Sequence, residues 1–137
     1  MAVVSNTSPV RHLVLLGQSE LIGRLFGTVL ILKVRAIEGP PNEELSRWLD
    51  SGEAEAIQLA LQLEAEVIIL DERNGREAAS GKGLNVIGVL GIFREAYRQG
   101  WIDNPLELLQ RLRTQGFRIS RPLARRFEEQ VRLARPY

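Results

Sequence analysis

Short runs of apolar, largely β-branched residues recur along the chain between segments with helical periodicity. The clearest run is Val67–Leu70, and such continuous apolar runs are typical of strands buried on both faces of a parallel sheet. Strands that alternate with helices favour βαβ units, with helices packed on the sheet. We therefore predict an α/β fold whose strands lie near residues 2–4, 28–32, 67–70 and 85–87.

Capping residues and glycines delimit the expected helices. Ser8 followed by Pro9 predicts a first helix that ends before Gly17, because serine is a good N-cap and proline suits the first helical position. By the same signals, further helices are expected at 19–26, 33–38, 42–49, 50–63, 72–79, 88–99, 104–115 and 120–134. No strand separates the last two, which predicts a C-terminal helical hairpin on the sheet.

A chain of 137 residues is expected to form a single domain over 1–137, with a sheet core in 1–87 and a helical part in 88–137. It contains no cysteine and one histidine, which excludes disulfides, thiolate zinc sites and multi-histidine metal sites. No apolar stretch is long enough to span a membrane, and the start lacks the pattern of a signal peptide. We expect a cytoplasmic protein.

The polar residues that follow the strands are the first candidates for chemistry. Ligands of open α/β sheets bind beyond the carboxyl ends of the strands. Asn6, Thr7 and Ser8 follow the first strand, and Asp71-Glu72-Arg73 follow the third. Carboxylates gathered without histidine or cysteine suit a hard divalent cation. The alternative for Asp71 is an acid that caps a turn or a helix.

Glu53 lies in the first turn of the helix expected at 50–63. Successive helical residues turn by about 100°, so Glu53 falls on the apolar side with Ala56, Ile57 and Ala60. This is an unusual place for a charge. Two interpretations are open: a functional carboxylate, or a capping box in which Asp50 caps the helix and Glu53 reaches back.

Positive charge is concentrated at the C-terminal end. Residues 105–137 contain eight arginines and three acids, and arginine suits bidentate contact with phosphate. Arg121, Arg125 and Arg132 fall on one stripe of the last helix, opposite an apolar stripe containing Leu123, Phe127 and Val131. The basic stripe is either a solvated face or a phosphate track. We interpret His12 as a packed or surface histidine.

Three motifs in order resemble the PIN-like proteins: Val4–Pro9, then Gly52–Ile57 with Leu59-Ala60, then Leu70–Arg73. More narrowly, they resemble a bacterial and archaeal branch predicted to bind or cut nucleic acid. The stretches Gly88–Gly91, Arg98–Ile102 and Gly116–Ser120 resemble the tail of that branch. The resemblance covers nearly the whole chain.

The resemblance implies a three-layer α/β/α fold with a central parallel sheet of about four strands. It implies a pocket that binds Mg²⁺ or Mn²⁺ and hydrolyses RNA phosphodiesters, so the ligands would be Asn6, Glu53, Asp71 and Glu72, with Glu53 and Asp71 catalytic. Thr7 or Ser8 would hold metal-bound water or a phosphate oxygen. Arg73, Arg76, Arg121 and Arg125 are the candidate nucleic-acid contacts.

Related members include the VapC-type ribonuclease toxins of toxin–antitoxin pairs, which often dimerise. The partners implied are therefore RNA, an antitoxin protein and a second copy of the chain.

The sequence departs from the family pattern in ways that keep a second function open. Asn6 stands where many PIN proteins have an acid, Glu38 is the one candidate for a further acid, and residues 32–50 look shortened. The alternative is a catalytically degenerate PIN-like module that binds nucleic acid or protein. A phosphate-accepting receiver domain with Asp71 as acceptor would need an acidic pair after the first strand, where the chain has Ser5-Asn6.

Overall fold

The computed structural model describes residues 3–27, 30–31, 40 and 42–134. Its strands are β1 (Val3–Ser5), β2 (Leu30–Ile31), β3 (Val67–Ile69) and β4 (Val86–Ile87). They form one parallel sheet in the order β2-β1-β3-β4. Val4 pairs with Ile68, and Ile68 pairs with Val86.

Eight helices surround this sheet in the described part of the chain. They are α1 (Thr7–Leu15), α2 (Glu20–Phe26), α3 (Glu43–Trp48), α4 (Ser51–Gln62), α5 (Arg73–Gly81), α6 (Val89–Arg98), α7 (Pro105–Thr114) and α8 (Arg121–Leu133). Asn42, Asp50 and Ser120 cap α3, α4 and α8 through their side-chain oxygens, as the sequence predicts. Each of these bonds satisfies a backbone N–H that has no partner within the helix.

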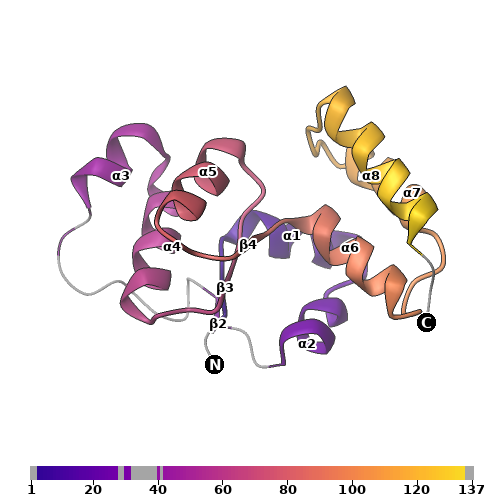
Figure 1. Ribbon diagram of the computed structural model, residues 1–137, viewed down its shortest axis with the longest axis horizontal. Helices are drawn as coiled ribbons and strands as arrows, with labels where there is room; N and C mark the ends of the chain where they lie inside the picture. Colours follow the sequence, from indigo (N-terminus) through magenta and orange to yellow (C-terminus); the bar gives the residue numbers. More distant parts are fainter. Residues whose placement is uncertain (1–2, 28–29, 32–39, 41, 135–137) are drawn as a thin grey trace.

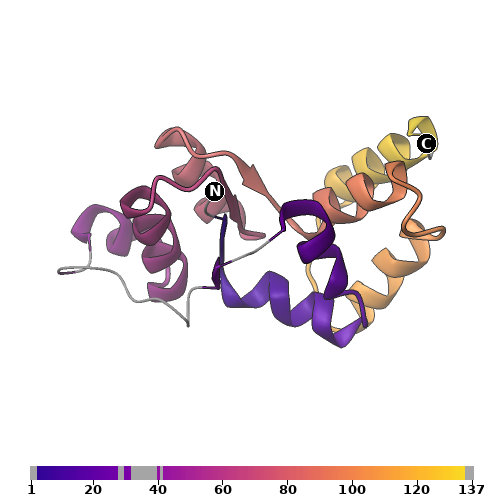
Figure 2. The ribbon, with the colours of Figure 1, turned by 90° about the horizontal axis from the view of Figure 1, so that it is seen from below.

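The helices cover both faces of the sheet (Figures 1 and 2). On one face Val4, Ile68 and Leu70 pack in a core with residues of α3, α4 and α5. On the other face Val3 and Ile69 belong to a larger core with α1, α2, α6, α7 and α8. Alternate residues of a strand point to opposite faces, so β1 and β3 each contribute to both cores. The fold is α/β, with helical layers on either side of a parallel sheet.

The last two helices lie at the end of the molecule opposite α3 (Figures 1 and 2). Their main contacts are with α6 and with each other, and α6 itself contacts β4. The sequence analysis placed α7 and α8 directly on the sheet. That placement was wrong, because α6 carries the strongly apolar face and occupies the position next to the strands: its Val89, Ile92, Phe93 and Ala96 are all buried.

Helix α1 begins two residues earlier than predicted, at Thr7 and not at Pro9. The N-cap is Asn6, whose Oδ1 accepts a hydrogen bond from the Thr7 backbone N–H at 2.9 Å, so Ser8 is not the cap. Pro9 lies inside the first turn, where its missing N–H leaves no hydrogen bond unmade. The helix ends as expected at Gly17, whose φ of 70° is readily adopted by glycine.

Two expectations fall outside the described residues: the helix at 33–38 and the acid Glu38 within it. No helix in the described part of the chain is long and apolar enough to cross a membrane.

Candidate nucleic-acid cleft and acidic pocket

The carboxyl ends of β1 and β3 lie side by side at the centre of the sheet. The backbone N–H of Asn6 donates to the carbonyl of Ile69 at 3.1 Å, so Asn6 and Asp71 both leave the sheet at this edge. In the order β2-β1-β3-β4, the chain turns in opposite directions from β1 and from β3. Such a switch point is the usual ligand crevice of an open α/β sheet.

Asp71 combines a structural contact with an unused oxygen. Its Oδ1 accepts a hydrogen bond from the Val89 backbone N–H at 2.8 Å, which caps α6. Its Oδ2 is buried and has no hydrogen-bond partner among the described residues. Burial raises the pKa of this carboxyl, and the hydrogen bond from Val89 and the positive neighbours His12 and Arg76 oppose that rise. One oxygen of Asp71 therefore caps a helix, as the alternative interpretation expects, and the other has no partner among the described residues.

Glu53 is a charged residue inside the core, as the helical pattern indicated. It is 5% exposed and lies on α4, where its carboxyl carbon would be 3.5 Å from a Cβ built at Gly75. The carboxylate therefore lies against α5, at an ordinary van der Waals distance from the Gly75 position. Desolvation first, and then the charges of Asp50 and Glu72, raise the Glu53 pKa to about 6, against a lowering by the hydrogen bond with Asp50. Asp50 Oδ1 accepts the Glu53 N–H at 2.8 Å, which is the cap half of the predicted capping box.

Glu72 is the electrostatic link between these two acids. Its charge raises the pKa of both Glu53 and Asp71. Glu53 and Asp71 are not among each other's main electrostatic neighbours. Glu72 is exposed and occupies the N-cap position of α5 without capping it through its side chain. The acids therefore form a chain from Asp50 through Glu53 and Glu72 to Asp71.

The predicted metal ligands do not converge on one point. In the described part of the chain, no group of three or more acidic or histidine side chains is placed to hold a metal ion. Asn6 Oδ1 and Asp71 Oδ1 each accept a hydrogen bond at the start of a helix. The unpartnered Asp71 Oδ2 and the mutual repulsion of the acids are nevertheless features that a cation would relieve. This donor set fits a hydrated hard cation held by one or two carboxylates.

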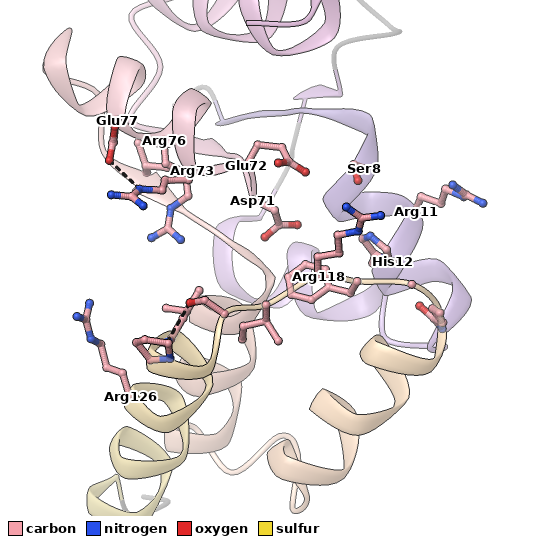
Figure 3. Close-up of a pocket in the computed structure, with 18 of the residues that line it drawn as sticks. Ser8, Arg11, His12, Asp71, Glu72, Arg73, Arg76, Glu77, Arg118 and Arg126 are labelled. Atoms are coloured by element: carbon pink, nitrogen blue, oxygen red, sulfur yellow. Dashed lines mark hydrogen bonds and ion pairs between the residues drawn. The ribbon is translucent and has the colours of Figure 1, made fainter.

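A wide cleft of about 1280 Å³ opens beside Asp71 and Glu72 (Figure 3), whereas Asn6, Asp50 and Glu53 are not among its lining residues. We call it the arginine cleft, because Arg11, Arg73, Arg76, Arg118 and Arg126 line it together with Asp71, Glu72 and His12. Figure 3 shows Asp71 between the α5 arginines on one side and His12 and Arg118 on the other. Arg73 pairs with Glu77 at 3.1 Å, which neutralises that arginine in part. The cleft thus presents several guanidinium groups around a carboxylate.

Unsatisfied polar atoms are concentrated in this cleft. Among the described residues, the buried side-chain atoms without a hydrogen-bond partner are His12 Nδ1, Asp71 Oδ2 and Gln115 Oε1, and all three residues line the arginine cleft. The His12 ring lies edge-on to Phe117, with centroids 5.2 Å apart. Buried polar atoms normally find partners, so their presence here marks a surface built to meet a polar ligand or water.

The structure sorts the predicted nucleic-acid contacts into two pairs. Arg73 and Arg76 line the arginine cleft, and so does Ser8. Arg121 and Arg125 are exposed on α8 and are not among the lining residues, and neither is Thr7. From the C-terminal part, the arginines that line the cleft are Arg118 and Arg126.

Sequence reasoning missed Arg11, Arg118 and Arg126, although a signal for two of them was present. Ser8, Arg11 and His12 follow the spacing of one helix face, and the cleft-lining residues Pro122, Leu123 and Arg126 share one face of α8 in the same way. The stripe of α8 that carries Arg121 and Arg125 was expected to contact nucleic acid instead. It is the partly apolar face, next to the core, that turns toward the cleft.

Residues 31–132, more than half of the chain, match a protein family described as a PIN domain. No curated protein and no solved structure matches the chain.

Proposed function

Because the chain belongs to the PIN-domain family, we propose that it is a metal-dependent ribonuclease that binds RNA in the arginine cleft and hydrolyses phosphodiester bonds beside Asp71. The observation that carries this proposal is a carboxylate with a free oxygen at a cleft lined by five arginines. The arginines suit phosphate oxygens, because each guanidinium presents a planar fork of donors.

In this proposal, the arginines bind the RNA phosphates and the acids bind the cation. Arg11, Arg118 and Arg126 hold phosphates of the strand on one side of the cleft, and Arg76 holds them on the other. Asp71, with Glu72 or Glu53, would hold hydrated Mg²⁺ or Mn²⁺ through one or two carboxylates. When bound, such a cation neutralises phosphate charge and lowers the pKa of a coordinated water.

A second candidate function, RNA binding without cleavage, is favoured by two observations. Asn6 supplies an amide where the family pattern has an acid, and no group of three metal-binding side chains is formed by the described residues. In that case the arginine cleft would bind RNA and Asp71 would serve only as the cap of α6. An antitoxin partner and a homodimer stay predictions of the family resemblance.

Cleavage of a 5′-labelled, mixed-sequence single-stranded RNA distinguishes the two functions. The assay uses Mn²⁺ at about millimolar concentration, which suits a weak hard-cation site, with and without a chelator. Asp71→Asn keeps an oxygen that can accept the Val89 N–H but removes the charge. Asp103→Asn is the matched control, because Asp103 is exposed and does not line the cleft.

The proposed nuclease predicts chelator-sensitive cleavage that is lost in Asp71→Asn and kept in Asp103→Asn. RNA that binds but is not cut supports the second function. Cleavage that is equal in wild type and Asp71→Asn contradicts a nuclease site at Asp71.

A further inference from the structure

A second, smaller cavity adjoins the arginine cleft. Its volume is about 260 Å³, and it lies among the ends of β4, α5, α6 and α8. The lining includes four arginines, which are Arg76, Arg94, Arg118 and Arg126. Three of them also line the arginine cleft, whereas Arg94 lines the small cavity alone. We call it the Arg94 cavity.

The charge around the Arg94 cavity is strongly unbalanced. Asp71 is the one acid among its lining residues, and it faces four guanidinium groups. Within the described part of the chain, none of these four arginines belongs to an ion pair within 4.0 Å. Arg94 is held in place by a neutral partner, since its Nη1 donates to Gln130 Oε1 at 3.1 Å. Like charges gathered around a small space create a positive potential that an anion would relieve.

The start of α6 adds to this potential. Gly88, Leu90 and Gly91 line the cavity, and they form the first turn of a ten-residue helix. Unpaired backbone N–H groups and the helix dipole make such a turn favourable for anions. A Cβ at Gly88 would approach Asp71 Oδ1 to 2.8 Å. The absence of a side chain there lets Asp71 Oδ1 accept the Val89 N–H, so the Asp71 carboxylate already occupies one N–H of this turn.

The size of the cavity limits the anion it can take. A space of about 260 Å³ accommodates a phosphate group with part of a sugar, whereas a strand needs the larger cleft. A phosphate monoester carries about −1.5 to −2 charges at neutral pH, against −1 for a diester. Four arginines therefore match the end of a phosphorylated strand better than its interior.

We infer that the Arg94 cavity binds the terminal phosphate monoester of an RNA strand whose next nucleotides lie in the arginine cleft. The path of the strand rests on the proposed function, and the phosphate site itself does not. The strand end would then be anchored next to Asp71, because Asp71 lines both cavities.

Binding of three internally labelled RNAs of one sequence tests the inference. One carries a 5′-phosphate, one a 3′-phosphate and one hydroxyl groups at both ends, and affinities are measured by fluorescence anisotropy in EDTA to prevent cleavage. We expect one phosphorylated end to bind about tenfold more tightly than the hydroxyl-ended RNA, the effect of one added charge-assisted hydrogen bond. Arg94→Gln should remove this gain, whereas Arg11→Gln, in the arginine cleft alone, should weaken all three RNAs alike.

A second pair of variants tests the inference even if Arg94→Gln does not fold. Arg125 and Arg126 are neighbouring exposed residues of α8, and only Arg126 lines the cavities. Arg126→Gln should lose the gain from the terminal phosphate, and Arg125→Gln should keep it. In a further arm without RNA, inorganic phosphate should raise the Tm of the wild type and not that of Arg94→Gln, at matched ionic strength.

The outcomes separate the inference from the proposed function. Equal wild-type affinity for the three RNAs overturns the inference and leaves RNA binding intact. A gain from the terminal phosphate that survives both Arg94→Gln and Arg126→Gln also overturns it. If no RNA binds but phosphate raises the Tm through Arg94, the phosphate site is supported and the proposed function is contradicted. If neither RNA nor phosphate binds, both fail.

Discussion

Glu53 is the residue whose charge should be most visible in stability measurements. Its pKa is raised from 4.5 to about 6, so the folded state holds the proton more tightly than the unfolded state does. As pH rises from 4.5 through 6, the unfolded state loses this proton first, and the folded state becomes less stable. Glu53→Gln removes the titration. We therefore expect the stability of Glu53→Gln relative to wild type to increase with pH, by about 1 kcal/mol after allowance for solvent screening.

Urea unfolding of both proteins at pH 4.5 and pH 7.5, in EDTA, measures this change. Glu55→Gln is the control, because Glu55 lies on the same helix and is not inside the core. A stability difference between wild type and Glu53→Gln that is independent of pH would show that the Glu53 carboxylate is solvated in the native state.

Replacing Asn6 by aspartate should strengthen the binding of a divalent cation. Asn6 Oδ1 and Asp50 Oδ1 lie 3.4 and 3.5 Å from the Cβ position of Gly52, so an acid at position 6 would join the acids around Glu53. Aspartate is as good an N-cap as asparagine. We expect Asn6→Asp to lower the Tm in EDTA by a few degrees, about 1 kcal/mol of repulsion, and to be stabilised by Mn²⁺ more than wild type is.

Thermal melts with and without Mn²⁺ check this expectation, with Asn42→Asp as the matched control. Asn42 caps α3 through the same kind of side-chain bond, and it does not line either cavity. If Mn²⁺ shifts the two variants equally, position 6 is not close enough to the acids to act as a ligand.

At the scale of elements, two helical glycines should respond in opposite ways to alanine. A Cβ at Gly91 in α6 would lie 2.7 Å from Ile87 Cγ1, whereas nothing lies within 4 Å of one at Gly23 in α2. Gly91→Ala must push α6 away from β4, and we expect a loss of about 1–3 kcal/mol. Gly23→Ala should gain about 0.5–1 kcal/mol from helix propensity. Chemical denaturation of both variants measures the pair, and a stabilising Gly91→Ala would contradict the close packing of α6 on β4.

The elements themselves were largely readable from the sequence, because their signals are local. The apolar run at 67–70 and the caps Asn42, Asp50 and Ser120 each depend on a few neighbouring residues. The cap of α1 was misassigned because Asn6, Ser8 and Pro9 all carry a local signal for a helix start. The position of α7 and α8 was wrong for a different reason: whether a helix packs on a sheet or on another helix depends on contacts far apart in the chain.

Part of the candidate site could be predicted, because the signals for that part are local. Asn6 and Asp71 could be paired because parallel strands end at a common edge, and the burial of Glu53 followed from its place on the helical wheel. A capping role for Asp71 was one of the two interpretations, but the helix that it caps could not be identified, since the bond joins residues eighteen positions apart. The arginine cleft likewise requires knowing that Arg11 and Arg118, which belong to distant segments, face one another (Figure 3).

At the scale of the whole molecule, the near-neutral net charge of +1 conceals a strong separation of charge. Asp50 and Glu72 lie close enough to Glu53 to raise its pKa, and five arginines line the cleft beside Asp71. Such a field attracts a polyanion without making the whole surface basic. We therefore expect that the cleft arginines alone determine how steeply the affinity for RNA falls as the salt concentration rises.

This separation predicts the salt dependence of RNA binding. Each phosphate contact on a single strand contributes about −0.7 to the slope of log K against log salt concentration. Contacts from three or four of the cleft arginines would give a slope of about −2 to −3. Arg118→Gln should make the slope shallower by about 0.7. Arg121→Gln should leave the slope unchanged, because Arg121 is exposed on α8 and does not line the cleft. Anisotropy titrations at several potassium chloride concentrations measure these slopes, and equal slopes for the two variants would mean that RNA binds elsewhere on the surface.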